Sequence, residues 1–254
     1  MSGVLYILLL LVPVQERPDY PLRDGRPTSK GIDRYVEEKA DALILEFQNF
    51  IGDTLYNANI YTEDLSKNED QNPLELGNYY PNEIFINNAE IFIGYELEWL
   101  PWQSRDTIIS SNLFVKAAVL HELMHHYIYQ VGIEMLRVDQ IEVDRAYQSF
   151  FRIYSDRGDP GSRFIEEGLC EYVTVKMNEI ITPRRPYIPR KASDLSLPEN
   201  AHDVYYRYSA YCLKDFLDTT GLKQGIKLLL HNPPPTSAEM LKPELFFSRL
   251  EGIE

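Results

Sequence analysis

The spacing of apolar residues along the chain predicts mainly amphipathic helices. Between residues 31 and 51 they recur at largely helical intervals. A second stripe, with intervals of three and four, runs through residues 110–130 and consists of Leu113, Ala117, Leu120, Met124 and Tyr127. Residues 110–112 are Ser, Ser and Asn, which suit a helix N-cap, and Gly132 is placed to end the helix. Both segments are therefore expected to be helices with one buried face.

Shorter patterns complete the predicted element order. Residues 83–87 alternate as a β-strand does, which predicts a strand at an edge or in the interior of a small sheet. Further helices are predicted over residues 138–154, 205–217, 222–230 and 238–250. Surface loops or turns are predicted over residues 62–73, 156–161 and 183–198. Gly221 separates two of the predicted helices.

The composition indicates one globular unit of ordinary kind. The chain has 254 residues, of which 44% are apolar and 25% charged, enough for one catalytic domain with an ample core. We assign that domain to residues 31–254, with subdomains near 31–132 and 133–254. A net charge of −14 argues against nucleic acid as a partner, because phosphate binding demands a basic patch. It does not identify a substrate or an oligomeric state.

The first 30 residues are read as a possible signal segment followed by an extended linker. Residues 4–12 are a continuous apolar run, too short to span a bilayer comfortably but suited to the core of an export signal. Cleavage would leave a secreted or periplasmic protein that begins near Gln15, in which Cys170 and Cys212 could form a disulfide. The alternative is a buried strand in a cytoplasmic protein, with both cysteines as small buried side chains.

The candidate chemistry lies in residues 121–125, which read His-Glu-Leu-Met-His inside the predicted helix. Residues four apart share a helix face, so the imidazoles of His121 and His125 can converge on one metal ion. Glu122 lies about 100° further round the helix and can reach a metal-bound water without being a ligand. This arrangement predicts a zinc site with a general base beside it.

A catalytic zinc ion takes three protein ligands, so the two histidines need a third. A histidine six residues after His125 would be the short-range solution, but that position is Val131. The best alternative is the segment 164–173, which carries acids beside an apolar face. Glu167 and Glu171 are four residues apart there, so one could bind the metal while the other hydrogen-bonds a ligand imidazole.

The two motifs together resemble those of the gluzincin metallopeptidases. The second motif reads Glu-Gly-Leu-Cys-Glu-Tyr at residues 167–172, similar to the Glu-Gly-apolar-Ala pattern of that group. The resemblance implies that Glu167 is the third zinc ligand and that Glu171 supports His121, with Glu166 as the rival ligand. Cys170 stands where the pattern has Ala. The segment 206–213 resembles the one that stabilises the tetrahedral intermediate in aminopeptidase-type members, which implies Tyr206 as an oxyanion donor, with Tyr208 as the alternative.

The resemblance also implies a fold and an activity. The expected fold is α+β and zincin-like: a small N-terminal sheet packed on the metal-binding helix, then a mostly helical C-terminal subdomain. In gluzincins the strand before the metal helix forms an edge of the cleft, a role expected here for residues 83–87. The loop between His125 and Glu167 is longer than in the family, and the Gly-x-Met-Glu-Asn segment that grips a substrate amine is absent. This absence argues against aminopeptidase activity, and the sequence does not decide between endo- and exopeptidase cleavage.

The expected function is zinc-dependent hydrolysis of a peptide or protein substrate. His121, His125 and Glu167 would hold Zn²⁺, and Glu122 would take the proton of the attacking water and deliver it to the leaving amine. The alternative is a binding or scaffold module of similar fold in which the metal site is structural or vestigial. No stable membrane span is expected from this sequence.

Overall fold

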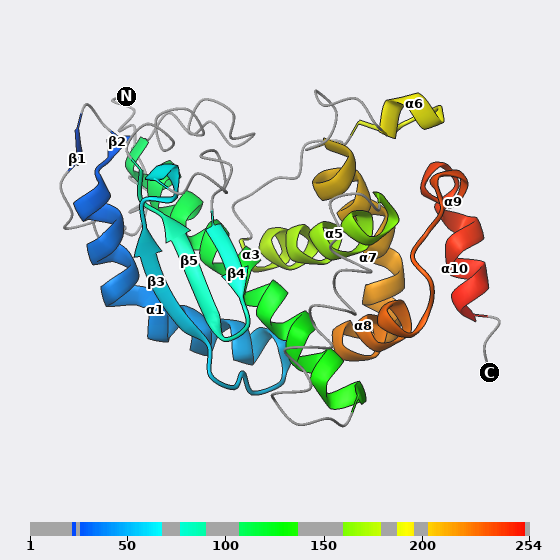
Figure 1. The fold of residues 1–254 in the computed structure, drawn as a ribbon, viewed down its shortest axis with the longest axis horizontal. Coiled ribbons are helices and arrows are strands. Elements are labelled where there is room, and N and C mark those ends of the chain that lie inside the picture. The colour runs from blue at the N-terminus through cyan, green and yellow to red at the C-terminus, as the bar shows by residue number, and fades with distance from the viewer. Residues whose placement is uncertain are drawn as a thin grey trace, which may run out of the picture.

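The structure is a mostly helical α+β arrangement with a small sheet at one side (Figure 1). It is a computed structural model that describes residues 22–23, 26–67, 77–89, 107–136, 160–178, 187–195 and 203–251. Short β1 (Leu22–Arg23) and β2 (Arg26–Pro27) pair antiparallel before the first helix. In Figure 1 the sheet and the first helix lie on the left and the later helices on the right.

The first predicted helix is confirmed as α1 (Ser29–Ile51). The Thr28 side chain caps its N-terminus by accepting a hydrogen bond from the Gly31 backbone N–H at 3.1 Å. At the other end Gly52 takes the left-handed conformation, with φ of 67°, which a glycine adopts at little cost. The buried side chains repeat at helical spacing, at Ile32, Val36, Leu43 and Phe47.

The sheet has three strands in the order β3-β5-β4. The predicted strand 83–87 is confirmed as β5 (Glu83–Asn87), which pairs parallel with β3 (Asn59–Glu63) and antiparallel with β4 (Gly77–Tyr80). Of the two positions left open for this strand, the interior of a small sheet is confirmed and the edge of the cleft is not, because β5 has a neighbour on both sides. Within the described residues, β4 is the edge strand on the side of the metal-binding helix. Ile84 and Ile86 of β5 are buried.

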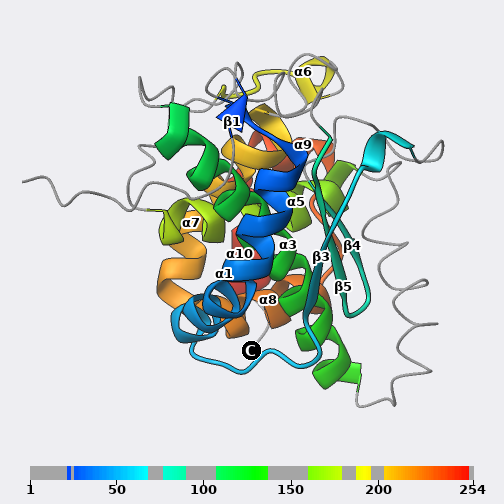
Figure 2. The same ribbon diagram turned by 90° about the vertical axis from the view of Figure 1, so that its left-hand side faces the viewer.

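The helix that carries both histidines is α3 (Thr107–Leu136), which runs through the middle of the molecule between α1, the sheet and the C-terminal helices (Figures 1 and 2). It does not end at Gly132, because tertiary packing overrides the local signal. Residues 117–120 and 126–132 are buried without interruption, so the helix is covered on all sides rather than along one stripe. Such burial fits a central helix whose polar side chains must find partners within the protein.

The C-terminal part is helical, with boundaries that differ from the prediction in several places. Its elements are α5 (Pro160–Met177), α6 (Ala192–Leu195), the π-helical turn η3 (Asp203–Tyr208), α7 (Ser209–Thr220), α8 (Leu222–His231), α9 (Ser237–Leu241) and α10 (Pro243–Glu251). The predicted break at Gly221 is confirmed, with φ of 78°. The predicted last helix is two helices, because Pro243 cannot continue the hydrogen-bond ladder of α9.

Three predicted loops also need correction. Thr62 and Glu63 belong to β3, and the 3-10 turn η1 (Leu65–Lys67) follows, so the described part of the loop predicted over 62–73 contains a strand end and a helical turn. Pro160 and Gly161 begin α5 instead of ending a turn, as proline suits the first turn of a helix. The segment predicted as a loop over 183–198 contains the short α6.

A cluster of ion pairs connects α8 to the end of α1 and to α3. Lys223 of α8 contacts Asp53 at 2.6 Å, just after α1, and Glu134 of α3 at 2.9 Å. The hydrogen bond from Lys223 lowers the pKa of the Asp53 carboxyl, while burial opposes the shift. Asp53 also accepts a hydrogen bond from Tyr127 of α3 at 3.2 Å. This cluster fixes the end of α1 against α3 and α8.

Two predictions fall outside the described residues: the apolar run 4–12 and the helix 138–154. Both stay predictions. Within the described ranges, no helix combines the length and the apolar character needed to cross a membrane.

Candidate metal centre

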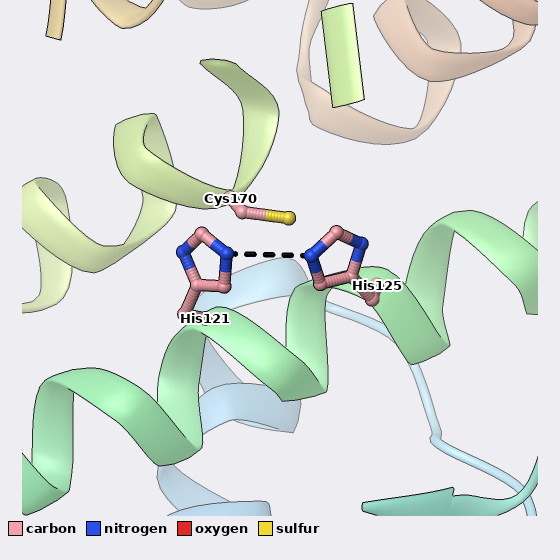
Figure 3. Close-up of side chains that lie close together, drawn as sticks. All are labelled: His121, His125 and Cys170. Atoms are coloured by element: carbon pink, nitrogen blue, oxygen red, sulfur yellow. Dashed lines mark hydrogen bonds between the residues drawn. The ribbon is translucent and has the colours of Figure 1, made fainter. Parts of the chain in front are cut away.

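Two imidazoles meet on the same face of α3. The Nε2 atoms of His121 and His125 lie 3.3 Å apart, and the side chains keep 15% and 12% of their surface exposed (Figure 3). The i, i+4 spacing on a regular helix produces this approach. Two ring nitrogens so close repel each other unless a proton or a cation lies between them, so the pair is suited to a shared metal ion.

Helix α5 brings Glu167 to the same point. Its Oε2 atom lies 3.2 Å from Nε2 of His121 and 4.0 Å from Nε2 of His125. Ligand atoms about 2.0–2.1 Å from a tetrahedral zinc ion would be about 3.3–3.4 Å apart, close to the first distance. Oε2 of Glu167 is also buried, and among the described residues no donor has the geometry of a hydrogen bond to it. An oxygen in that state fits a metal ligand better than a structural acceptor.

Glu166, the rival ligand in the sequence, has a different role. Its Oε1 atom accepts a hydrogen bond from Nδ1 of His125 at 2.9 Å. A proton on Nδ1 leaves the Nε2 lone pair of His125 directed at Glu167 and His121, as a metal site requires. The acid that orients an imidazole is therefore Glu166 acting on His125, a pairing that the sequence interpretation did not make.

Glu171 acts on His121, the histidine that the family resemblance implies. Its effect on His121 is electrostatic. Its carboxyl interacts electrostatically with His121 and with Arg207, and burial raises its pKa. The structure places it one turn beyond Glu167 on α5. We therefore regard Glu171 as part of the charge environment of His121, while the direct hydrogen bond to an imidazole comes from Glu166.

Cys170 lies beside the two histidines, a position that its sequence context did not predict. One donor atom each from His121, His125 and Cys170 lies within 4.8 Å of the other two. Figure 3 shows the sulfur directed toward the gap between the two rings. Both cysteines are free thiols, so Cys170 and Cys212 form no disulfide here. The signal for its role was its spacing, three residues after Glu167 and four after Glu166, which places all three side chains toward α3.

Two sets of three donors are thus available, one completed by Glu167 and the other by Cys170. We favour Glu167 as the third ligand because its oxygen lies 3.2 and 4.0 Å from the two ring nitrogens and belongs to a carboxylate. Burial raises the pKa of the Cys170 thiol to about 12, so without a metal the sulfur stays protonated.

The edge strand β4 lies directly against the motif. A Cβ atom added at Gly77 would stand 2.8 Å from Cγ and from Oε1 of Glu122, so glycine is what allows the strand to approach this carboxylate. Two residues further along β4, the ring of Tyr79 stacks on the imidazole of His125, with centroids 6.3 Å apart and an interplanar angle of 9°. The expected general base therefore lies between α3 and an edge strand.

The neighbouring His126 is a structural residue. Its Nε2 atom donates to the Tyr56 carbonyl at 2.8 Å, and its Nδ1 atom pairs with the Tyr79 hydroxyl at 3.3 Å. Burial lowers its pKa, so it stays neutral and holds β4 and the segment after α1 against α3.

The structure separates the two candidate tyrosines. Tyr206, in η3, stacks on the imidazole of His121 with centroids 5.7 Å apart and an angle of 22°. Its hydroxyl pairs with the Arg163 side chain, and burial raises its pKa well above the ordinary value, so it stays a protonated donor. The Tyr208 hydroxyl instead donates a hydrogen bond to the Met240 carbonyl of α9 at 3.0 Å. Tyr206 is the tyrosine at the centre.

The charges around the centre also fit a divalent cation. Four carboxylates, those of residues 122, 166, 167 and 171, gather on α3 and α5 around two imidazoles, while Arg163 and Arg207 are the cations that act on them. Among the described residues the acids at this point outnumber the arginines, and such a surplus of carboxyl groups favours a bound cation. Imidazole nitrogens and carboxylate oxygens are donors that divalent metal ions accept.

Comparison with known proteins adds no relative from which a function could be transferred. No family model matches the chain. A search of curated proteins and a search of solved structures each found no significant match.

Proposed function

We propose that this protein is a zinc-dependent peptide hydrolase with a zincin-like fold. The observation that carries the proposal is the convergence of Nε2 of His121, Nε2 of His125 and Oε2 of Glu167, 3.2 to 4.0 Å from one another. Residues from two helices supply these atoms, and Glu122 stands beside them. Such a set of three ligands leaves one coordination position for water, as catalytic zinc sites do.

Each residue of the proposed site has a separate role in the reaction. His121, His125 and Glu167 would hold the zinc ion, which would supply Lewis acidity and make water more acidic, with a pKa toward about 7. Glu122 accepts the proton of the attacking water and passes it to the leaving amine. Tyr206 donates a hydrogen bond to the oxygen on which negative charge develops. Glu166 keeps His125 in the tautomer whose Nε2 faces the metal.

The substrate would bind along β4 rather than along β5. Among the described residues β4 has a strand neighbour on one side only, and an extended peptide can join an edge of this kind by strand addition. Gly77 of β4 brings that edge within contact of Glu122. A peptide aligned there would present its backbone carbonyls to the centre, which supports a peptide or protein as the substrate.

The proposal is tested by separating metal binding from hydrolysis. We expect Glu122→Gln to keep about one zinc ion per chain by elemental analysis and to abolish chelator-sensitive cleavage of a mixed peptide library. Glu167→Ala should lose the zinc, because it removes a ligand. Glu134→Gln is the matched control, the same substitution on the same helix away from the centre, and its stability is measured as well because Glu134 pairs with Lys223. Zinc that survives Glu167→Ala, or cleavage that survives Glu122→Gln, would contradict the assignment.

A second function has one observation in its favour. Cys170 offers a fourth protein donor, and structural zinc sites are closed by four protein ligands. A binding or scaffold module with a structural metal would lose stability on chelation and cleave no peptide in any variant. A structural site has no chemical need of Glu122 beside it, so the hydrolase is the better supported of the two.

A further inference from the structure

Helix α5 presents two pairs of side chains to the two histidines. Glu166 and Cys170 are four residues apart and both interact with His125. Glu167 and Glu171 are also four apart and both interact with His121. Because residues three and four apart share a helix face, the sulfur of Cys170 lies one turn from the proposed third ligand and on the same side. The centre therefore has one more potential ligand than a catalytic zinc site uses.

We propose that Cys170 is an alternative fourth ligand, which competes with water for the last coordination position and gives the centre a closed form and an open form. The inference rests on the metal site of the proposed function. In the closed form His121, His125, Glu167 and Cys170 surround the metal. In the open form the sulfur turns away and water takes its place.

The geometry allows both forms. The sulfur and the two ring nitrogens lie within 4.8 Å of one another, against about 3.5 Å for nitrogen and sulfur on one tetrahedral zinc with Zn–S of about 2.3 Å. Rotation about the single side-chain torsion of cysteine would move the sulfur toward the rings or away from them. Cys170 is fully buried with its backbone held in α5, so the torsion is the one adjustable element.

The exchange is balanced in atoms and charge. When the sulfur binds, its S–H bond breaks, the proton leaves to solvent, and the thiolate replaces the bound water. When water returns, the sulfur takes up a proton again. No oxidant or reductant takes part. A thiolate is a softer ligand than water, so the closed form also favours zinc over harder ions such as Mg²⁺ or Mn²⁺.

The test uses the full-length chain, stripped of metal by a chelator and reloaded with Co²⁺, whose absorption reports on its ligands. We expect a near-ultraviolet thiolate-to-cobalt band in the wild type and in Cys212→Ala, the control for the other free cysteine. Cys170→Ala and Cys170→Ser should bind one Co²⁺ per chain without that band. Their affinity for zinc, from competition with a chromophoric chelator, should fall by about 10-fold or more. Circular dichroism checks that each variant is folded.

A wild-type protein that binds one Co²⁺ without the thiolate band overturns the inference, as does a band that persists in Cys170→Ala. Failure of the hydrolase proposal gives a different pattern. In that case the band appears and depends on Cys170, but no variant cleaves any peptide. Conversely, cleavage that depends on Glu122 in a protein without the band keeps the hydrolase and removes the closed form. If both proposals hold, Cys170→Ala cleaves faster per bound metal than the wild type.

Discussion

The close packing of α5 on α7 leads to a prediction that depends on the fold alone. Gly168 sits next to the proposed ligand Glu167 and faces Ser209 and Leu213 of α7. A Cβ atom added there would stand 2.7 Å from Cβ of Ser209 and 2.9 Å from Cδ1 of Leu213, and closer still to Oγ of Ser209. That hydroxyl donates to the Phe164 carbonyl of α5, so the two helices are held together at this point. Gly168→Ala must push them apart.

Two opposing effects set the size of the change. Replacing glycine by alanine inside a helix stabilises it by about 1 kcal/mol through helix propensity. Overpacking a core costs about 1–3 kcal/mol, and the contact with Cβ of Ser209 belongs near the upper end, because that atom cannot move without its backbone. The net expectation is a loss of about 2 kcal/mol in the free energy of unfolding. For a chain of this size that is a drop of about 4–8 °C in Tm.

Urea denaturation followed by circular dichroism, together with differential scanning fluorimetry, measures the loss directly. Ser209→Gly supplies the control, because it removes both atoms that the new methyl group would strike at Ser209. The double variant should recover at least about 1 kcal/mol relative to the sum of the single changes. A Gly168→Ala protein as stable as the wild type, or more stable, would refute the close packing of α5 and α7.

Three further predictions follow from other contacts. Gly77→Ala should displace the Glu122 carboxylate and lower kcat by about 10-fold or more while zinc content by elemental analysis stays unchanged; an unaltered kcat would refute the contact. Tyr206→Phe should lower kcat by about 10²-fold, whereas Tyr208→Phe should not; equal effects would remove Tyr206 from the mechanism. Asp53→Asn should lower Tm at pH 7. Because the folded pKa of Asp53 is lowered, its stabilisation is present above about pH 3.9 and the difference in Tm should vanish as the pH falls below that value; a constant difference would contradict the ion pair.

The long helices were predictable because their signals are local. The apolar spacing in residues 31–51 and 110–130 reflects the period of the helix itself. Gly132 misled the prediction of an end, because a buried helix continues wherever its surroundings cover it. The strands β3 and β4 have no such signal. Each has only four or five residues, and the pairing of β3 with β5 joins residues 24 positions apart in the sequence.

The sequence by itself determined the chemical types at the centre: two histidines and a glutamate on one helix, and acids on a second. It did so because the i, i+4 spacing gives those side chains a common direction on any α-helix. Only the tertiary structure decided how the second helix is turned against the first. That rotation assigns Glu166 to His125, brings Cys170 beside both rings, and separates Tyr206 from Tyr208. Packing between segments more than 40 residues apart sets the rotation, and no local pattern encodes it.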